Sequence, residues 1–328
     1  MHSDSSSRAA HAPRFVAPRA LGPGSHLRLI APAGPFDRDA FQVAVERLRR
    51  RFTVTYDDGI FDRQAYLAGD DARRLGELRA ALADPAVDAL VAARGGYGAM
   101  RLLPGLDVAE VAQARKLLVG FSDLTALHAL WQRAGLRSLH ASMIAALGRL
   151  PEQRLERWSA ALRGELPVEE IPGRWSTRGK VVAEVVGGNL AVLCALLGTP
   201  YFPPVDGAIL LLEDIGEAPY RVDRMLTSLR LAGIFARTAG VLLGDFTRCE
   251  PQRDGRTVDE VLRERLGDLA CPVLCGLAVG HGDSENLEVP LGALAELDAD
   301  RGCVTFLQGA VEPRPDDGSD GGSDGGAA

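Results

Sequence analysis

The sequence has 328 residues, of which 46% are hydrophobic, 25% are charged and only 5% are aromatic. This length and composition predict a globular protein with two domains or one large domain, and they exclude a collagen-like or wholly disordered chain. No run of apolar residues approaches the ~20 that a membrane-spanning helix needs, so we expect no membrane segment.

The net charge of −7 is concentrated at the C-terminus. Residues 312–328 contain five acids and one arginine and so carry −4, which leaves −3 on the rest of the chain. A body this close to neutral has no basic surface for nucleic acid or a membrane, and we expect a small molecule or peptide as the partner. The five cysteines are too few, and odd in number, for a disulfide framework, which favours a cytoplasmic protein.

In chain order, residues 1–25 come first and predict a disordered N-terminus, because they are rich in serine, alanine and proline and lack the apolar core of a secretory signal. Residues 26–150 then alternate apolar or β-branched runs with segments of helical periodicity. This alternation is typical of an α/β domain with a largely parallel sheet. The expected strands cover 27–31, 53–56, 87–92 and 117–120, and the expected helices cover 41–52, 70–83 and 124–131.

Prolines and glycines interrupt residues 151–180, which we interpret as a linker with one short helix. Residues 181–311 predict a second domain, and residues 312–328, which repeat Gly-Ser-Asp-Gly, predict a disordered acidic tail. In the second domain we expect strands at 181–186, 208–212, 240–243, 273–279, 293–297 and 303–308, and helices at 190–197, 221–232 and 258–266.

The most informative segment is Gly120-Phe121-Ser122-Asp123, which joins a predicted strand to a predicted helix. A serine at such a turn projects its hydroxyl away from the backbone, and the next backbone N–H can help to form an oxyanion hole, as in the nucleophile elbow of hydrolases. Leu124, however, stands where the G-x-S-x-G motif has its last glycine. From these residues alone, the alternative is that Ser122 or Asp123 only caps the helix.

A nucleophilic serine needs a base, and the base needs an orienting group. His281 is flanked by glycines directly after an apolar strand, which places an imidazole on a loop at the edge of a sheet. Glu213 ends the apolar strand before residues 214–217, so its carboxylate is fixed by the sheet. Asp214 and Glu217 are competing choices for the same role.

Two glycine-containing loops are further candidates. Arg94-Gly95-Gly96-Tyr97-Gly98 follows a strand, and its backbone amides could approach a phosphate or an oxyanion, although it does not match a nucleotide-binding motif. In Gly187-Gly188-Asn189, the asparagine most simply caps the next helix. We find no spacing of histidine, cysteine and carboxylate residues that predicts a metal site, and we expect no cofactor.

Several of these segments, in this order, resemble the LD-carboxypeptidases, also called muramoyltetrapeptide carboxypeptidases. The resemblance extends from about Leu27 to Phe306. The motifs that carry it are Arg94-Gly95-Gly96-Tyr97-Gly98, Gly120-Phe121-Ser122-Asp123-Leu124-Thr125, Gly187-Gly188-Asn189-Leu190, Leu196-Leu197-Gly198-Thr199-Pro200, Leu212-Glu213-Asp214-Ile215-Gly216-Glu217 and Gly280-His281 with Pro290-Leu291-Gly292.

The resemblance implies a Rossmann-like N-terminal domain, a mostly β C-terminal domain and a metal-free serine carboxypeptidase. It implies a muropeptide tetrapeptide as substrate, a homodimer, and an active site between the two domains. By motif position, we expect a catalytic triad of Ser122, Glu213 and His281. We expect an oxyanion hole from the backbone N–H groups of Gly96 and Asp123, and substrate binding by Arg94, Tyr97 and Asn189. The alternative for Arg94 is a structural ion pair.

One departure is that Glu288 stands where we expect a threonine in relatives, close to His281. Two other functions remain open. One is hydrolysis of an aminoacyl- or peptidyl-nucleotide, as in the microcin-immunity branch of the same superfamily, for which Trp175 could stack on a base, although surface packing explains Trp175 equally well. The other is non-catalytic binding of muropeptides, against which the intact triad argues.

Overall fold

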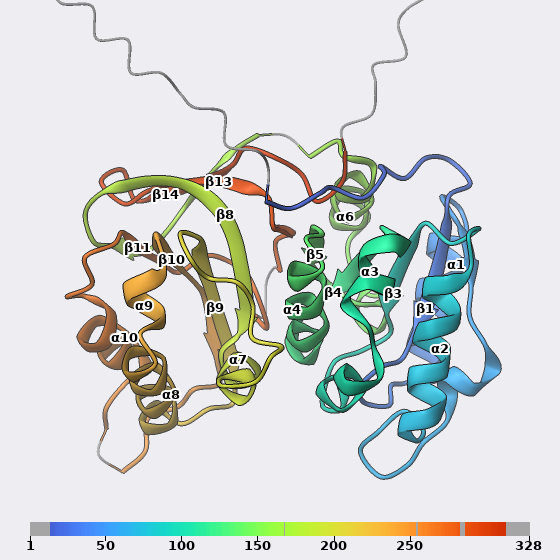
Figure 1. Cartoon of the computed structure of the whole chain (residues 1–328), viewed down its shortest axis with the longest axis horizontal. Coiled ribbons are helices and arrows are strands. Elements are labelled where there is room, and N and C mark those ends of the chain that lie inside the picture. Colours follow the sequence, from blue (N-terminus) through green and yellow to red (C-terminus); the bar gives the residue numbers. More distant parts are fainter. Residues whose placement is uncertain (1–13, 167, 254, 283–285, 313–328) are drawn as a thin grey trace, which may run out of the picture.

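The computed structural model describes residues 14–312 except 167, 254 and 283–285. Its helices and strands form two halves that lie side by side in Figure 1, each built around one sheet. The expected α/β fold, with a parallel sheet in the first half and many strands in the second, is confirmed. No helix in the described ranges has the length and apolar character needed to cross a membrane.

The first sheet has the strand order β12-β5-β4-β3-β1-β2 and is parallel except for its edge strand β12. Helices α1, α5 and α6 cover one face, and α2, α3 and α4 cover the other. The strands are β1 (His26–Ile30), β2 (Thr53–Thr55), β3 (Ala89–Ala92), β4 (Leu117–Gly120), β5 (Ser138–His140) and β12 (Val289–Leu291). The helices are α1 (Arg38–Leu48), α2 (Asp71–Ala83), α3 (Val108–Ala114), α4 (Thr125–Arg133), α5 (Ile144–Leu147) and α6 (Glu152–Arg163).

The second sheet has the order β6-β14-β13-β8-β9-β10-β11-β7, with a parallel centre and antiparallel pairs toward both edges. Helices α7 to α10 cover one face, and side chains of the antiparallel strands pack against the other. The strands are β6 (Glu170–Pro172), β7 (Trp175–Ser176), β8 (Lys180–Asn189), β9 (Ile209–Ile215), β10 (Gly240–Thr247), β11 (Val273–Cys275), β13 (Leu294–Asp298) and β14 (Cys303–Phe306). The helices are α7 (Leu190–Leu196), α8 (Pro219–Leu231), α9 (Ile234–Arg237) and α10 (Val258–Leu266).

The N-terminal segment differs from its expected disorder in the part that the structure describes. Phe15 and Leu21 are buried, and the backbone of Val16 pairs with the segment around Leu136. These few apolar side chains have no helical or alternating period, so the sequence pattern did not reveal their packing. Residues 1–13, and residues 313–328 of the expected acidic tail, lie outside the described residues.

The expected linker 151–180 also contains more structure than its composition suggests. Helix α6 buries Leu155, Trp158 and Leu162 against the first sheet, whereas β6 and β7 form the two edges of the second sheet. This segment therefore contributes to both halves. The chain later returns from the second half to the first. Strand β12 follows β11 of the second sheet in the chain, but it pairs with β5 of the first sheet.

Candidate active site

Ser122 lies in a sharp turn between β4 and α4. β4 is a fully buried run that ends at Gly120, and one 3₁₀ turn, Ser122–Leu124, leads into α4. The backbone φ of Ser122 is +63°, in the left-handed region that costs a residue with a side chain ~1–2 kcal/mol. A strained, partly exposed serine after a buried strand is the geometry of a nucleophile elbow.

Buried His128 supports this turn from within the fold. Its Nε2 donates to the Gly120 carbonyl at 2.8 Å, and its Nδ1 accepts from the Ser138 hydroxyl at 2.8 Å. Burial lowers the pKa of His128 to about 4, so the ring is neutral near pH 7 and can both donate and accept. His128 therefore fixes the end of β4 and the start of the turn.

The glycine-containing loop after β3 lies against Ser122. A Cβ on Gly95 would be 3.0 Å from the Ser122 Cβ and 3.1 Å from its Oγ, so a larger residue would push the serine side chain away. The buried Asp123 carboxylate accepts the backbone N–H of Ala99 at 2.8 Å, which ties the end of this loop to the turn. The backbone N–H groups of Gly96 and Asp123 thus belong to two segments in contact beside Ser122.

Buried Glu213 and partly buried His281 form a pair in the second half. Glu213 lies in β9 with no solvent exposure, and its Oε2 accepts a hydrogen bond from His281 Nδ1 at 2.8 Å. Gly280 has a φ of +115°, and a Cβ there would be 2.6 Å from the same Oε2, so the pair requires glycine at this position. Because Nδ1 is bound to the carboxylate, Nε2 is the nitrogen left to exchange a proton with a nucleophile.

The three carboxylates considered for the orienting role have different partners. Glu213 bonds to His281, whereas Asp214 accepts hydrogen bonds at the start of α7. Glu217 lies 3.5 Å from the Arg221 guanidinium in an i,i+4 ion pair. The geometry therefore favours Glu213 over both competitors.

Phe121 connects the two halves of the site. It directly precedes Ser122, and its ring centroid lies 4.7 Å from that of His281. The two halves also touch at the first turn of α4, where the Thr125 hydroxyl accepts the backbone N–H of Asn189 at 2.9 Å. In the described ranges no hydrogen bond joins Ser122 to His281, and such pairs are often long in unliganded enzymes.

Asn189, expected to bind substrate, uses its amide inside the chain. Its Oδ1 accepts the Val192 N–H and caps α7 at 3.1 Å, and its Nδ2 donates to Asp214 Oδ1 at 3.2 Å. Asp214 also accepts the backbone N–H groups of Ala191 and Ile215. The first turn of α7 needs these acceptors, so the structure favours the capping role of Asn189 over substrate contact.

Asp214 provides a pH-dependent contribution to stability that can be measured. Burial raises its pKa from 3.8 to about 6, with its three hydrogen bonds opposing this and the Glu213 charge adding to it. Between these values the folded protein holds a proton that the unfolded chain has released, so this group makes stability fall as pH rises. We expect the free energy of unfolding of wild type, relative to that of Asp214→Asn, to decrease from pH 4 to pH 7 in urea titrations. A constant difference across this range would contradict the expectation.

Arg94 and Tyr97 lie exposed on the loop beside Ser122. The Arg94 guanidinium donates to the Pro35 carbonyl at 2.6 Å, and no carboxylate within the described ranges pairs with it. Tyr97 is 49% exposed, and its ring meets that of Tyr66 edge-on with centroids 5.6 Å apart. Arg94 therefore has no charge partner in the described part of the chain, and it lies on the loop that contacts the candidate nucleophile through Gly95.

Two contacts around His281 were missed from the sequence. The Phe121 ring contacts the imidazole at a tilt, and the buried Glu288 carboxylate forms ion pairs near the same loop. An aromatic residue directly before a candidate nucleophile is a signal for the first contact, whereas nothing local indicates the second. Among the described residues, no group of three or more histidine, cysteine, aspartate or glutamate side chains is arranged to hold a metal ion.

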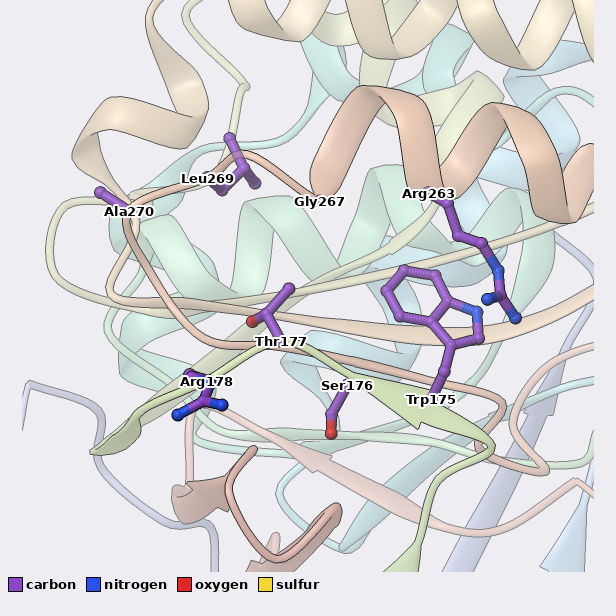
Figure 2. A pocket seen from close by; sticks show the side chains of 8 residues that line it. All are labelled: Trp175, Ser176, Thr177, Arg178, Arg263, Gly267, Leu269 and Ala270. Atoms are coloured by element: carbon purple, nitrogen blue, oxygen red, sulfur yellow. The ribbon is translucent and has the colours of Figure 1, made fainter.

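A separate pocket lies between α10 and the edge strand β7. Figure 2 shows the Trp175 ring in this pocket beside the side chain of Arg263, whose guanidinium carbon lies 5.3 Å from the ring centroid. The residues that line the pocket include none of the predicted site residues. Trp175, on β7, is thus in contact with Arg263 of α10.

Comparisons with known proteins match the chain along most of its length. Residues 27–141 match the model of the LD-carboxypeptidase N-terminal domain, and residues 182–297 match that of the C-terminal domain. The chain is 34% identical to the murein tetrapeptide carboxypeptidase of Pseudomonas aeruginosa, over 83% of this chain and 93% of that protein.

Solved structures show the same architecture. The muramoyltetrapeptide carboxypeptidase from Oxalobacter formigenes superposes with a TM-score of 0.77 at 30% identity, covering 86% of this chain and 97% of that one. The microcin C7 self-immunity protein MccF superposes with a TM-score of 0.80, covering 90% of this chain and 100% of that one. Its identity is 23%, so this second likeness concerns the fold alone.

Proposed function

Because this chain belongs to the LD-carboxypeptidase family and is a hydrolase of the carboxypeptidase type, we propose that it releases the terminal D-alanine from muropeptide tetrapeptides, as a step of peptidoglycan recycling. The observation that carries the proposal is the 2.8 Å hydrogen bond between buried Glu213 and His281, whose ring contacts that of Phe121, the residue before Ser122. Such a pair orients an imidazole as the base for a neighbouring hydroxyl.

In the proposed mechanism, His281 Nε2 takes the hydroxyl proton of Ser122 as Oγ attacks the carbonyl carbon before D-alanine. Glu213 holds the ring in the required tautomer and stabilises its charged form. The backbone N–H groups of Gly96 and Asp123 stabilise the oxyanion. His281 then donates the proton to the leaving amine, so that D-alanine departs and an acyl-enzyme remains. Water hydrolyses the acyl-enzyme, with His281 acting as base and then acid.

The proposal is tested directly by incubating the purified protein with a muropeptide tetrapeptide and measuring products by mass spectrometry. We expect loss of one alanine and no further shortening. A matched peptide with L-alanine at the terminus reports stereochemical selectivity. No release of alanine from the tetrapeptide under conditions in which the protein is folded would overturn the proposed substrate.

Arg94 is proposed to bind the free terminal carboxylate that distinguishes the substrate of an exopeptidase. Among the described residues its guanidinium has a carbonyl partner but no acidic one, so it can pair with an incoming carboxylate. A charged hydrogen bond of ~1.5–3 kcal/mol predicts that Arg94→Ala lowers kcat/KM by about 10- to 100-fold. The measurement compares the tetrapeptide with its C-terminal amide, and we expect wild type to discriminate between them more strongly than the variant.

The matched control for this prediction is Arg133→Ala, because Arg133 is also exposed and also donates to a backbone carbonyl, at the far end of α4. Arg133→Ala should leave kcat/KM unchanged both for the tetrapeptide and for its C-terminal amide. Equal discrimination by wild type and Arg94→Ala would remove Arg94 from the binding site. Tyr97, on the same loop, is proposed to contact the peptide stem.

The nucleotide-hydrolase alternative gains no specific support. Trp175, the residue that could stack on a base, contacts Arg263 in the pocket of Figure 2 and is paired through β7 to Cys275. The described part of the chain therefore offers no reason to prefer a nucleotide substrate over a muropeptide.

A further inference from the structure

The loop that carries His281 starts in the second sheet and ends in the first. It leaves β11 and arrives at β12, where Val289 pairs with His140 of β5. His140 in turn pairs with Gly120 of β4, two residues before Ser122. Because neighbouring strands are ~4.8 Å apart, this row of three residues fixes the end of the histidine loop about 10 Å from the serine turn.

Glu288, directly before β12, is held by α6. It is only 3% exposed, and its Oε2 lies 3.0 Å from the Arg157 Nε. Its Oε1 lies 3.8 Å from the Arg154 Nη2. The same Nη2 donates to the Asn286 carbonyl at 3.3 Å. Two arginines one turn apart on α6 therefore bind Glu288, and one of them, Arg154, also binds the segment before it.

Asn286 continues these contacts to the imidazole. Its Oδ1 accepts the backbone N–H of Gly280 at 2.9 Å, and Gly280 directly precedes His281. A second bond from the Leu287 N–H to the Ala278 carbonyl, at 2.8 Å, closes the base of the same loop. A continuous set of contacts therefore leads from α6 through Glu288 and Asn286 to the candidate base.

An ion pair that contains a buried carboxylate is an inefficient way to gain stability alone. Removing a carboxylate from water has a large desolvation cost, and burial raises the pKa of Glu288 while the two guanidinium groups oppose the rise. Apolar residues of similar volume often stabilise a fold at least as well. The charged cluster of Arg154, Arg157 and Glu288 instead fixes the distance and orientation of the His281 loop relative to α6.

We propose that Arg154, Arg157 and Glu288 are positioning residues, which lock the His281 loop to α6 and the first sheet and so set the imidazole against Ser122. This inference rests on the proposed triad. Glu213 fixes Nδ1 from the second sheet, whereas the cluster fixes the backbone of the loop from the first. The orientation of His281 thus depends on groups from both sheets.

The proposal predicts a separation between catalysis and binding. Arg94 and Tyr97, proposed to bind substrate, lie on the loop after β3, which none of the cluster residues touches in the described contacts. Loosening the histidine loop should therefore lower kcat and leave KM within about twofold. A displacement of the base of about 1 Å corresponds to a loss of about 10- to 100-fold in rate.

The test uses Glu288→Gln, which keeps the shape of the side chain and removes its charge. The matched control is Glu156→Gln, which removes the charge of an ion-paired glutamate on α6, the helix that carries Arg154 and Arg157. Glu156 pairs with Arg51 and Arg163 at the surface. If Glu288→Gln does not fold, Arg157→Gln replaces it, because Arg154 remains to neutralise Glu288.

Reactivity of Ser122 is read without the peptide substrate, using a fluorophosphonate and intact-mass spectrometry. Oγ forms a bond to phosphorus, the phosphorus–fluorine bond breaks with release of fluoride, and the hydroxyl proton passes to His281 Nε2. The rate therefore reports the pairing of nucleophile and base. Steady-state kcat and KM for the tetrapeptide are measured on the same preparations.

We expect Glu288→Gln to label about 10- to 100-fold more slowly and to lose kcat by a similar factor, while Glu156→Gln behaves as wild type. Labelling of folded Glu288→Gln at the wild-type rate, or a change in KM alone, would overturn the positioning role. Wild type that labels at Ser122 but releases no alanine would overturn the proposed substrate only. Wild type that does not label at Ser122 would overturn both the triad and this inference.

Discussion

Replacing Ser122 by alanine is expected to abolish release of D-alanine while the protein stays folded. The hydroxyl is the proposed nucleophile, and loss of such a group from a serine triad lowers kcat by about 10⁴- to 10⁶-fold. Alanine fits the same space, because it removes only the Oγ that approaches Gly95. The measurement is kcat for the tetrapeptide by mass spectrometry, with circular dichroism to confirm the fold.

Ser228→Ala is a suitable control, since it removes a serine hydroxyl from α8 of the second half, where that hydroxyl donates to the Arg224 carbonyl. Its activity should equal that of wild type. If Ser122→Ala retained more than about a hundredth of the wild-type kcat, a nucleophile other than Ser122 would have to be sought.

The same position allows a test of strain. With a φ of +63°, Ser122 is in a conformation that glycine adopts freely and that other residues adopt at a cost. Ser122→Gly should therefore be inactive and yet no less stable than Ser122→Ala, with a midpoint of urea unfolding that is higher. The turn would then be a place where stability is reduced for the sake of hydroxyl orientation.

The parts of the site that could be predicted from the sequence are local. The turn at Ser122 is visible because an apolar strand, a glycine and a helical period follow one another within fifteen residues. His281 stands out through its two flanking glycines, one of which, Gly280, makes room for Glu213. Glu213 itself could only be ranked beside Asp214 and Glu217, since a strand pattern does not reveal which carboxylate meets the imidazole. The resemblance to a family supplied that choice.

The parts that could not be predicted depend on contacts between distant segments. β12 contains Pro290, which argues against a strand in a sequence pattern, and it is tolerated here because β12 lies at the edge of its sheet. β5 has only three residues and therefore no readable period. Without these two strands, the meeting of Glu288 with α6 cannot be inferred. The prediction of a linker at 151–180 missed β6 and β7 for the same reason. These strands have only three and two residues, and prolines and glycines lie within or next to them.

The arrangement of the site follows a general feature of parallel sheets. Ser122 and the Arg94 loop follow the carboxyl ends of β4 and β3, and Glu213 lies toward the carboxyl end of β9. Ligands of α/β proteins commonly bind at this edge of a sheet. Here the two such edges face each other through Phe121 and the His281 loop. Neither half contains the whole proposed triad.

Replacing Glu213 by glutamine is expected to have the second large effect, a loss of kcat of about 10²- to 10⁴-fold. Glutamine has the same shape, but it carries no charge to stabilise the imidazolium. Its amide nitrogen can also donate to His281 Nδ1 and so favour the wrong tautomer. Because Glu213 is fully buried and its Oε1 has no partner among the described residues, removing the charge should not destabilise the fold by breaking another ion pair. The expected signature is a large fall in kcat with little change in the free energy of unfolding.

The matched control is Glu217→Gln, four residues further along, where the carboxylate pairs with Arg221 outside the proposed triad. This variant should keep its kcat, which would separate the two glutamates that the sequence pattern left in competition. The fluorophosphonate rate at Ser122 should fall in Glu213→Gln and not in Glu217→Gln, since only Glu213 acts through the base. Full labelling of Ser122 in Glu213→Gln would mean that His281 is oriented without this carboxylate, and the reverse pattern would assign the role to Glu217.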